Sequence, residues 1–163
     1  GTNAWGDAKD PRIPTLPLLS WDGICGLARN GFAIGGHTRS HPHLGAVSDA
    51  QTTDEIAGCA EDIYRHVGLR PATFAYPYGD STDNAIGCVR DHYAYACTTD
   101  LRVLTSREDP ALIPRLDAYY FQKAGSIESW GSPAFIRFVR RRAFARRLRR
   151  RIRDGMRGAG KVT

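Results

Sequence analysis

Helix signals alternate with short apolar runs along the first 120 residues, and this alternation constrains the fold more than any other feature of the chain. Three amphipathic helices are expected, the first two each preceded by a serine that can cap them, over residues 21–29, 49–67 and 82–91. Short buried strands are expected at residues 32–34, 73–76 and 93–98, with a fourth at 113–120. Parallel strands joined by helical crossovers give this order, so the sequence predicts an α/β fold, either a barrel or an open sheet.

In both arrangements, functional side chains gather on the loops that follow the carboxyl ends of the strands. The segment after the first expected strand is rich in histidine, and Pro77-Tyr78-Gly79 follows the second. We therefore expect these two segments to meet at one rim of the sheet. Residues 1–18 contain three prolines and little periodicity, which indicates an irregular loop.

Three histidines occur within seven residues, at His37, His41 and His43. His37 and His41 are four apart, so on a helical turn both rings project to one side, and Gly35-Gly36 would let the backbone bend just before them. Two imidazoles with one carboxylate and an open position form a metal-hydrolase site. The alternative is a polar surface loop that happens to be rich in histidine. Spacing alone leaves both open.

The four cysteines are scattered without a C-x-x-C pair, at Cys25, Cys59, Cys88 and Cys97. We expect them to pack in the core rather than form a disulfide or a metal site, which leaves the redox compartment open. No apolar run approaches the length of a membrane span, and no signal peptide is visible at the beginning of the sequence. Localisation therefore stays open, with the cell envelope or the cytoplasmic face of a membrane as candidates.

The charge is divided between a mildly acidic body and a strongly basic end. From residue 134 onward the sequence has eleven Arg and one Lys against a single acid, Asp154. Ser132-Pro133 is a helix start signal, and a broken apolar stripe runs between the arginines. Such a helix can contact an anionic membrane or an acidic polymer through residues 134–153, contact nucleic acid, or lie solvated on the body. Of these three interpretations, the sequence favours nucleic acid least. The stripe consists of Phe135, Phe138, Val139, Phe144, Leu148 and Ile152.

Two motifs together resemble the polysaccharide deacetylases of the NodB-homology (carbohydrate esterase 4) family. The segment Gly36-His37-Thr38-Arg39-Ser40-His41-Pro42 is similar to that family's H-[ST]-x-x-H-P motif, and Phe74-Ala75-Tyr76-Pro77-Tyr78-Gly79 is similar to its third motif. The resemblance covers about residues 15–120. It implies a partial, distorted (β/α) barrel followed by a basic C-terminal helix, and hydrolysis of acetyl groups from an N-acetylglucosamine-type polysaccharide or precursor.

The resemblance also implies roles for individual residues. His37 and His41 would coordinate a divalent metal, usually zinc, and Thr38 would brace the loop by hydrogen bonding. The Tyr78 backbone N–H would hold the oxyanion, and Pro77 and Tyr78 would line the substrate site. His43 is not a ligand in the family's motif. Hydrolysis would proceed by attack of water on the acetyl carbonyl, with the metal polarising that carbonyl.

The general base and the general acid stay unassigned. The family's first motif is a strand ending in two aspartates, and residues 1–20 do not match it, because Asp7 and Asp10 lie in irregular sequence. The family's late Leu-x-His segment has no counterpart either; His92 is expected to be structural and His66 to be a solvated helix end.

An arginine common in the third motif is replaced by Ala75. Arg115 is a candidate to orient acidic groups in its place, with a surface ion pair as the alternative. Two hypotheses fit these departures. In one, residues 1–131 are a NodB-like domain incomplete at its start, followed by the helix and tail of 132–163. In the other, the chain is a non-catalytic carbohydrate- or membrane-associated protein.

Overall fold

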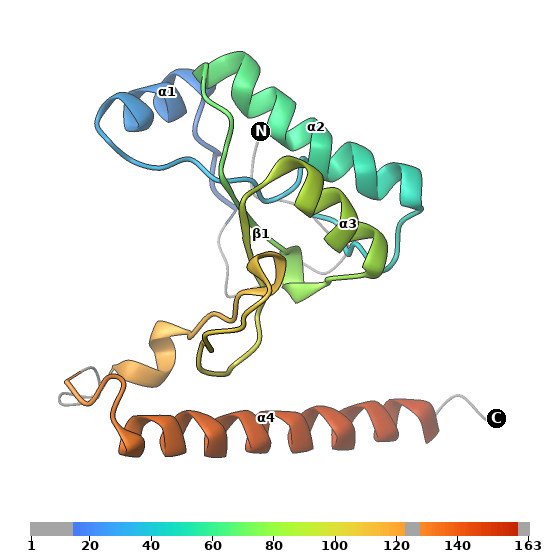
Figure 1. The fold of residues 1–163 in the computed structure, drawn as a ribbon. Coiled ribbons are helices and arrows are strands. Elements are labelled where there is room, and N and C mark those ends of the chain that lie inside the picture. Colours follow the sequence, from blue (N-terminus) through green and yellow to red (C-terminus); the bar gives the residue numbers. More distant parts are fainter. Residues whose placement is uncertain (1–14, 123–127, 160–163) are drawn as a thin grey trace. The chain divides into compact units, whose positions relative to one another are not determined.

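The computed structural model describes residues 15–122 and 128–159, with side chains up to residue 149, and combines helices with a small parallel sheet (Figure 1). This part of the chain contains the helices α1 (Trp21–Arg29), α2 (Asp49–Val67), α3 (Asp83–His92) and α4 (Pro133–Ala159). Its strands are β1 (Thr73–Ala75) and β2 (Tyr95–Cys97). Three short 3-10 turns complete it: η1 (Pro77–Gly79), η2 (Pro110–Leu112) and η3 (Ala118–Phe121). The expected mixture of helices with a parallel sheet is confirmed.

The first two helices begin where their capping serines predict. The Ser20 hydroxyl accepts a hydrogen bond from the Gly23 N–H, and Ser48 forms a reciprocal capping box with Gln51. Gly68, with φ of 80°, ends α2 in the left-handed conformation. The expected bounds of α1 and α2 are those observed, and α3 lies one residue further along the chain than expected.

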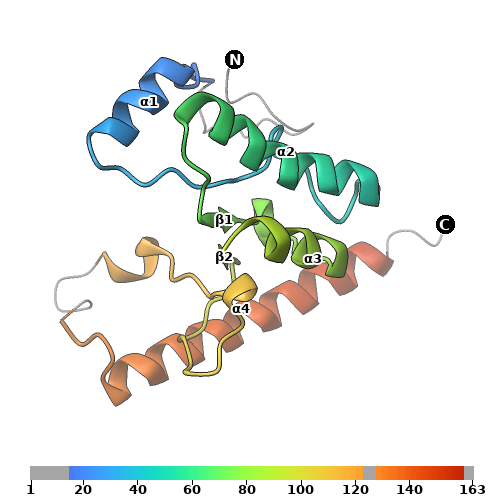
Figure 2. The ribbon, with the colours of Figure 1, turned by 45° about the horizontal axis from the view of Figure 1, so that its top comes forward.

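The two strands pair in parallel with Phe74 opposite Ala96, and Figure 2 shows them side by side. Single parallel bridges extend this sheet on both sides, from Gly36 to Phe74 and from Ile113 to Cys97. Four segments therefore meet in the order Gly36, β1, β2, Ile113. Because Gly36 pairs in parallel with β1, the segment that follows Gly36 and the turn that follows β1 leave the sheet at the same edge.

Two of the expected strands are wrong. Residues 32–34 are not a buried strand: Phe32 is 61% exposed, and its N–H donates to the Leu27 carbonyl, so it serves the end of α1 instead of a sheet. Residues 113–120 pair with β2 only at Ile113, because Pro114 has no N–H to continue the ladder. The chain then turns into η3.

The sheet and the helices α2 and α3 enclose one apolar core. Ile56 and Ala60 of α2, Phe74 of β1 and Val89 of α3 are almost completely buried in it. The buried Tyr93 hydroxyl donates to the Ile56 carbonyl at 3.0 Å and so satisfies its polar atom. All four cysteines are free thiols. Cys59 and Cys88 are buried, as expected for core packing, whereas Cys25 and Cys97 are half-buried.

Contacts divide the chain into two compact units, one of Gly1–Thr99 with Arg107–Ile113 and one of Asp100–Ser106 with Pro114–Thr163. The second unit has its own core, in which Leu101 packs with Phe135 and Val139 of α4. The expected boundary between residues 131 and 132 concerned the extent of the NodB-like domain, and it stays a prediction. None of the helices in residues 15–122 and 128–159 is long and apolar enough to cross a membrane.

Candidate active site

The histidine loop and the turn after β1 meet because Gly36 pairs with β1. Gly36 donates its N–H to the Thr73 carbonyl at 2.8 Å and accepts from the Ala75 N–H at 3.0 Å. A side chain at Gly36 would collide with the Tyr93 ring. Close approach to the core, rather than the sharp bend expected at Gly35-Gly36, is therefore the reason for glycine here.

His37 and His41 lie together, with ring centroids 4.8 Å apart and planes at 71°. The Nδ1 atom of His37 is 2.6 Å from the Ala75 carbonyl oxygen. A carbonyl oxygen can only accept, so Nδ1 carries the proton and the Nε2 lone pair is available to a ligand. Metal-binding histidines commonly make this kind of hydrogen bond with their second nitrogen.

The loop is not the helical turn that the spacing suggested. Among the described residues, three that are not glycine have positive φ: Thr38 (67°), His41 (60°) and Tyr78 (58°). All three belong to the candidate site. Such conformations cost about 1–3 kcal/mol each and persist where surrounding contacts impose them, commonly at functional sites. Backbone strain therefore marks the same residues as the motifs do.

The Thr38 hydroxyl closes the loop on itself. It donates to the His37 carbonyl and accepts the His41 N–H at 3.1 Å. This links the two histidines through one side chain, which is the geometry that the expected supporting role of Thr38 requires.

Carboxylates of α2 hold the loop from the other side. Glu55 accepts the N–H groups of Arg39 at 2.7 Å and Ser40 at 2.9 Å, and it also accepts the Ser40 hydroxyl. The Arg39 guanidinium pairs with Asp54 and with Asp62, each at 2.7 Å. The Asp62 carboxylate hydrogen-bonded to Arg39 raises the pKa of the guanidinium, and the same contact lowers the pKa of Asp62. The loop is thus tied to α2 by charge-assisted bonds.

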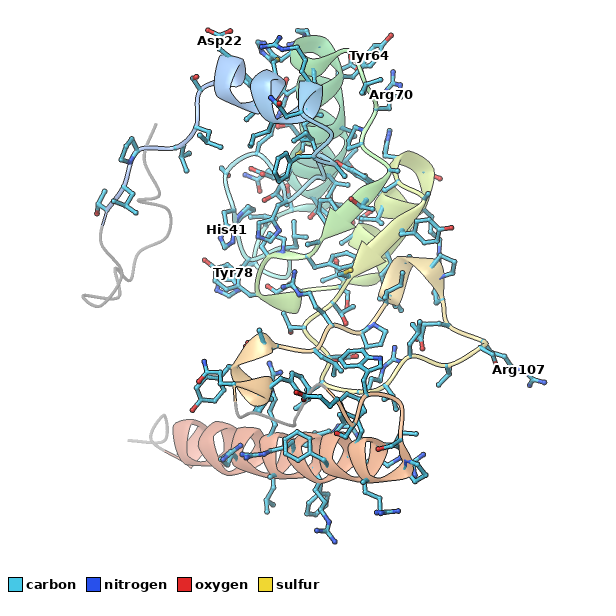
Figure 3. All side chains as sticks on the ribbon, turned by 90° about the vertical axis from the view of Figure 1, so that its left-hand side faces the viewer. Asp22, His41, Tyr64, Arg70, Tyr78 and Arg107 are labelled. Atoms are coloured by element: carbon cyan, nitrogen blue, oxygen red, sulfur yellow. The ribbon has the colours of Figure 1, made fainter. Side chains whose placement is uncertain are left out.

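Tyr78 lies against both His41 and His43, and Figure 3 shows it beside His41. Its hydroxyl is 3.2 Å from Nδ1 of His41, and its ring stacks on His43 with centroids 3.8 Å apart. His43 in turn pairs through Nδ1 with Asp80 at 2.9 Å. A chain of contacts therefore runs from Asp80 through His43 and Tyr78 to His41.

Burial lowers the pKa of His41, and the neighbouring His37 lowers it further. Both effects disfavour the imidazolium form. Neutral imidazole is the form that binds a metal, so the environment of His41 keeps it ready for that role.

Two imidazoles suit a divalent ion such as zinc, but a complete site needs a further ligand. Within residues 15–122 and 128–159, no group of three His, Cys, Asp or Glu side chains is arranged to hold a metal. Asp7 and Asp10, which do not match the family's aspartate motif, lie outside the described residues. The fit is therefore that of a partial site with two nitrogen ligands.

The other expected site residues have different surroundings. Pro77 is fully buried, so it shapes the turn, and the exposed surface there is that of Tyr78. Arg115 is exposed and belongs to the second unit, where its N–H donates to the Asp100 carbonyl at 3.3 Å. His66 stacks on Trp21 with centroids 4.2 Å apart, and His92 ends α3 on the surface.

Glu55 and Asp80 were not identified from the sequence. Both act on the histidine segment through contacts that span 15 or more residues. Asp80 directly follows the Pro-Tyr-Gly turn, and acids recur along α2 at Asp54, Glu55 and Asp62. The place of Asp80 after the turn and the recurrence of acids along α2 are the signals that the sequence offers for Asp80 and Glu55.

The model of the polysaccharide deacetylase family matches residues 4–96, which is more than half of the 163-residue chain. The chain belongs to the polysaccharide deacetylase family. Both histidines and the Pro77–Gly79 turn lie inside the matched range of this family.

A curated relative of this family, the peptidoglycan-N-acetylglucosamine deacetylase of Bacillus cereus, is 33% identical over 60 residues. That match covers 37% of this chain and 22% of the relative. The chain therefore spans about a fifth of the length of this relative, and less than half of the two solved structures compared next.

Over 60% of its length the chain superposes on part of solved deacetylases. A deacetylase of Streptococcus pyogenes, solved with acetate, superposes with a TM-score of 0.56 at 20% identity, covering 60% of this chain and 44% of that one. A polysaccharide deacetylase of Bacillus cereus gives a TM-score of 0.55 at 24% identity, covering 60% and 32%. At this identity the likeness concerns the fold alone.

Proposed function

We propose that this chain carries part of a metal-dependent N-deacetylase centre that acts on an N-acetylglucosamine-type polysaccharide or its precursor. The observation that supports it most is the pair of facing imidazoles, with Nδ1 of His37 committed to the Ala75 carbonyl, beside the turn that contains Tyr78. Family membership supports the reaction class, and the name of the Bacillus cereus relative suggests peptidoglycan as the polymer. The cell envelope would then be the place of action.

His37 and His41 would hold the ion, for which zinc is the first candidate given its preference for imidazole nitrogen. When bound there, it would supply a Lewis acid for the acetyl carbonyl and lower the pKa of water. Thr38 and Glu55 bind backbone N–H groups of the loop. The rings are oriented through their Nδ1 atoms, that of His37 by the Ala75 carbonyl and that of His41 by the Tyr78 hydroxyl. The partial (β/α) barrel of the family would be the scaffold.

The turn after β1 would handle the substrate. The backbone N–H of Tyr78 would donate a hydrogen bond to the oxygen that gains negative charge during hydrolysis. Tyr78 is 48% exposed although its ring contacts His41 and His43, so the exposed part of the side chain would be the surface that meets a sugar. Pro77 is buried at the start of the same turn, where its ring fixes one backbone angle. The role of Arg115 in orienting an acidic group stays a prediction from the family resemblance, with no position assigned to it in this centre, and the general base stays unassigned.

A second candidate is a non-catalytic protein that keeps the sugar-facing rim. It is favoured by the absence of a third ligand among the residues that the structure describes. Such a protein would bind amino-sugar polymers and a metal without hydrolysing the acetyl group.

Acetate release from N-acetylglucosamine oligomers, measured with and without added zinc, separates the two candidates. We expect low turnover, because among the described residues no carboxylate joins the two histidines. That turnover should need metal and should be lost in His37→Ala. Zinc binding without any acetate release would support the non-catalytic protein. An absence of zinc binding and of acetate release would remove the proposed centre.

A further inference from the structure

The described side chains of α4 carry positive charge without any acid. Residues 133–149 contain seven arginines and no Asp or Glu. Nothing in the proposed deacetylase centre uses this charge. The helix is also divided into two apolar faces, and they differ in what covers them.

The inner face of α4 completes the core of the second unit. Phe135 is 3% exposed and Val139 is 1% exposed, and both pack with Leu101. Arg142 belongs to this side, because its guanidinium lies over the rings of Tyr120 and Phe138 at 5.8 and 5.4 Å from their centroids. These contacts account for how α4 is attached to its own unit.

The outer face carries apolar side chains that the unit does not cover. Phe144 is 70% exposed and Leu148 is 49% exposed. Each follows an inner residue by nine positions, which at ~100° per residue sets it about 180° around the helix from Phe135 or Val139. The two are four residues apart and therefore adjacent on the surface, and Ile152 continues the spacing in the sequence.

Arginines flank this outer apolar pair on both sides. Arg140, Arg141 and Arg147 are exposed and lie three or four residues from Phe144, within about 60° of it around the helix axis. Their long side chains can reach past Phe144 to an acidic surface while its ring enters an apolar layer. One surface thus combines positive charge with exposed apolar groups.

We propose that the outer face of α4 binds an anionic lipid bilayer, with Phe144 and Leu148 entering the acyl boundary and Arg140, Arg141 and Arg147 contacting lipid phosphates. Nucleic acid and acidic polysaccharides would satisfy the arginines but would leave Phe144 and Leu148 in water. A bilayer accommodates both chemistries at the depth that interfacial helices reach. The contact would hold the deacetylase unit near a membrane surface.

Sedimentation of the full chain with vesicles tests this proposal. Vesicles of equal parts phosphatidylcholine and phosphatidylglycerol are compared with vesicles of phosphatidylcholine alone. We expect binding to the anionic vesicles only, with affinity that falls as salt is raised. Equal binding to both kinds of vesicle, or none to either, would overturn the proposal.

Variants separate insertion from simple charge attraction. Phe144→Ala should weaken binding about tenfold, as expected for partial burial of one aromatic side chain. Arg141→Gln should weaken it about fivefold at low salt. Both positions are exposed, so helicity measured by circular dichroism should be unchanged.

Two matched controls lie in the first unit. Phe32→Ala removes a phenylalanine that is 61% exposed, compared with 70% for Phe144, and Arg107→Gln removes an arginine that projects outward in Figure 3. Neither should alter vesicle binding. If Phe144→Ala binds like the wild type while a DNA duplex binds more tightly than the vesicles, the helix face recognises nucleic acid and the proposal is wrong.

Discussion

At the scale of single residues, the Tyr78 hydroxyl is the group that orients His41. It is 3.2 Å from Nδ1 of His41. Tyr78→Phe keeps the ring, its stack on His43 and the backbone turn, but removes that bond. We expect zinc affinity to fall about tenfold, the lower end of the effect of losing a hydrogen-bond partner of a metal ligand. Calorimetric titration with zinc measures it.

The matched control is Tyr95→Phe, because Tyr95 is also exposed but lies on β2. Its zinc affinity should equal that of the wild type. An unchanged affinity in Tyr78→Phe would mean that packing alone orients His41.

Glu55 is the residue whose loss should loosen the histidine loop most. It accepts hydrogen bonds from the backbone N–H groups of Arg39 and Ser40 and from the Ser40 hydroxyl. Glu55→Ala leaves these donors without their acceptor, so we expect a loss of about 1–3 kcal/mol in the free energy of unfolding. Urea denaturation measures it, with Glu61→Ala as the control.

Glu61 is also on α2, and the charged partner that the described part of the chain gives it is Arg70, in a surface ion pair at 3.5 Å. Its removal should change the free energy of unfolding by less than about 1 kcal/mol. Equal losses in the two variants would show that Glu55 does not anchor the loop.

At the scale of elements, the ion pair of Arg39 and Asp62 joins the loop to α2 and should respond to acid. The hydrogen bond from Arg39 lowers the pKa of Asp62 in the folded protein. A carboxylate whose pKa is lowered in the folded state stabilises the fold at pH values above the pKa of an ordinary aspartate, about 3.9. This contribution is lost as the pH falls below that value. The stability difference between wild type and Asp62→Asn should therefore shrink as pH falls through about 4.

Thermal unfolding at a series of pH values measures this difference. Asp91→Asn is the control, because Asp91 lies exposed near the end of α3 and is not part of the Arg39 cluster. A difference for Asp62→Asn that stays constant down to about pH 3 would contradict the linkage.

The turn after β1 depends on glycine at position 79. Gly79 has φ of 83°, and a Cβ there would collide with the Thr99 side chain. We expect Gly79→Ala to destabilise the fold by about 1–3 kcal/mol. Gly87→Ala in α3 is the control, because nothing lies within 4 Å of a Cβ there, and it should be neutral or stabilising. Urea denaturation compares the two; similar losses would show that the turn is not strained.

Elements could be predicted wherever their signals are local. Ser20, Ser48 and Gly68 mark helix ends through bonds within a few residues, and β1 and β2 are apolar runs bounded by breakers. The run at 32–34 failed because its first N–H closes α1, and the fourth strand failed because Pro114 ends the pairing. Both strand predictions failed because of backbone hydrogen bonding at the junction between two segments, which the pattern of apolar residues does not specify.

At the scale of the whole molecule, the sequence could predict the pair His37 and His41 but not what holds it. The motif spacing identifies the two rings, and parallel strands explain why they meet the Pro77–Gly79 turn. Glu55, Asp62 and Asp80 reach the loop from distant positions, and no local pattern specifies such partners. The positive φ values at Thr38 and His41 could not be predicted either, because no local pattern specifies them.

The central claim is that His37 and His41 together bind a metal in a deacetylase centre. Calorimetric titration of the full chain with zinc tests it most directly. The variants are His37→Ala and His41→Ala, and the control is His92→Ala at a surface residue. We predict one zinc site in the wild type and in His92→Ala, and affinity at least about tenfold weaker in each of the other two. Equal zinc affinity in all four proteins would contradict the claim.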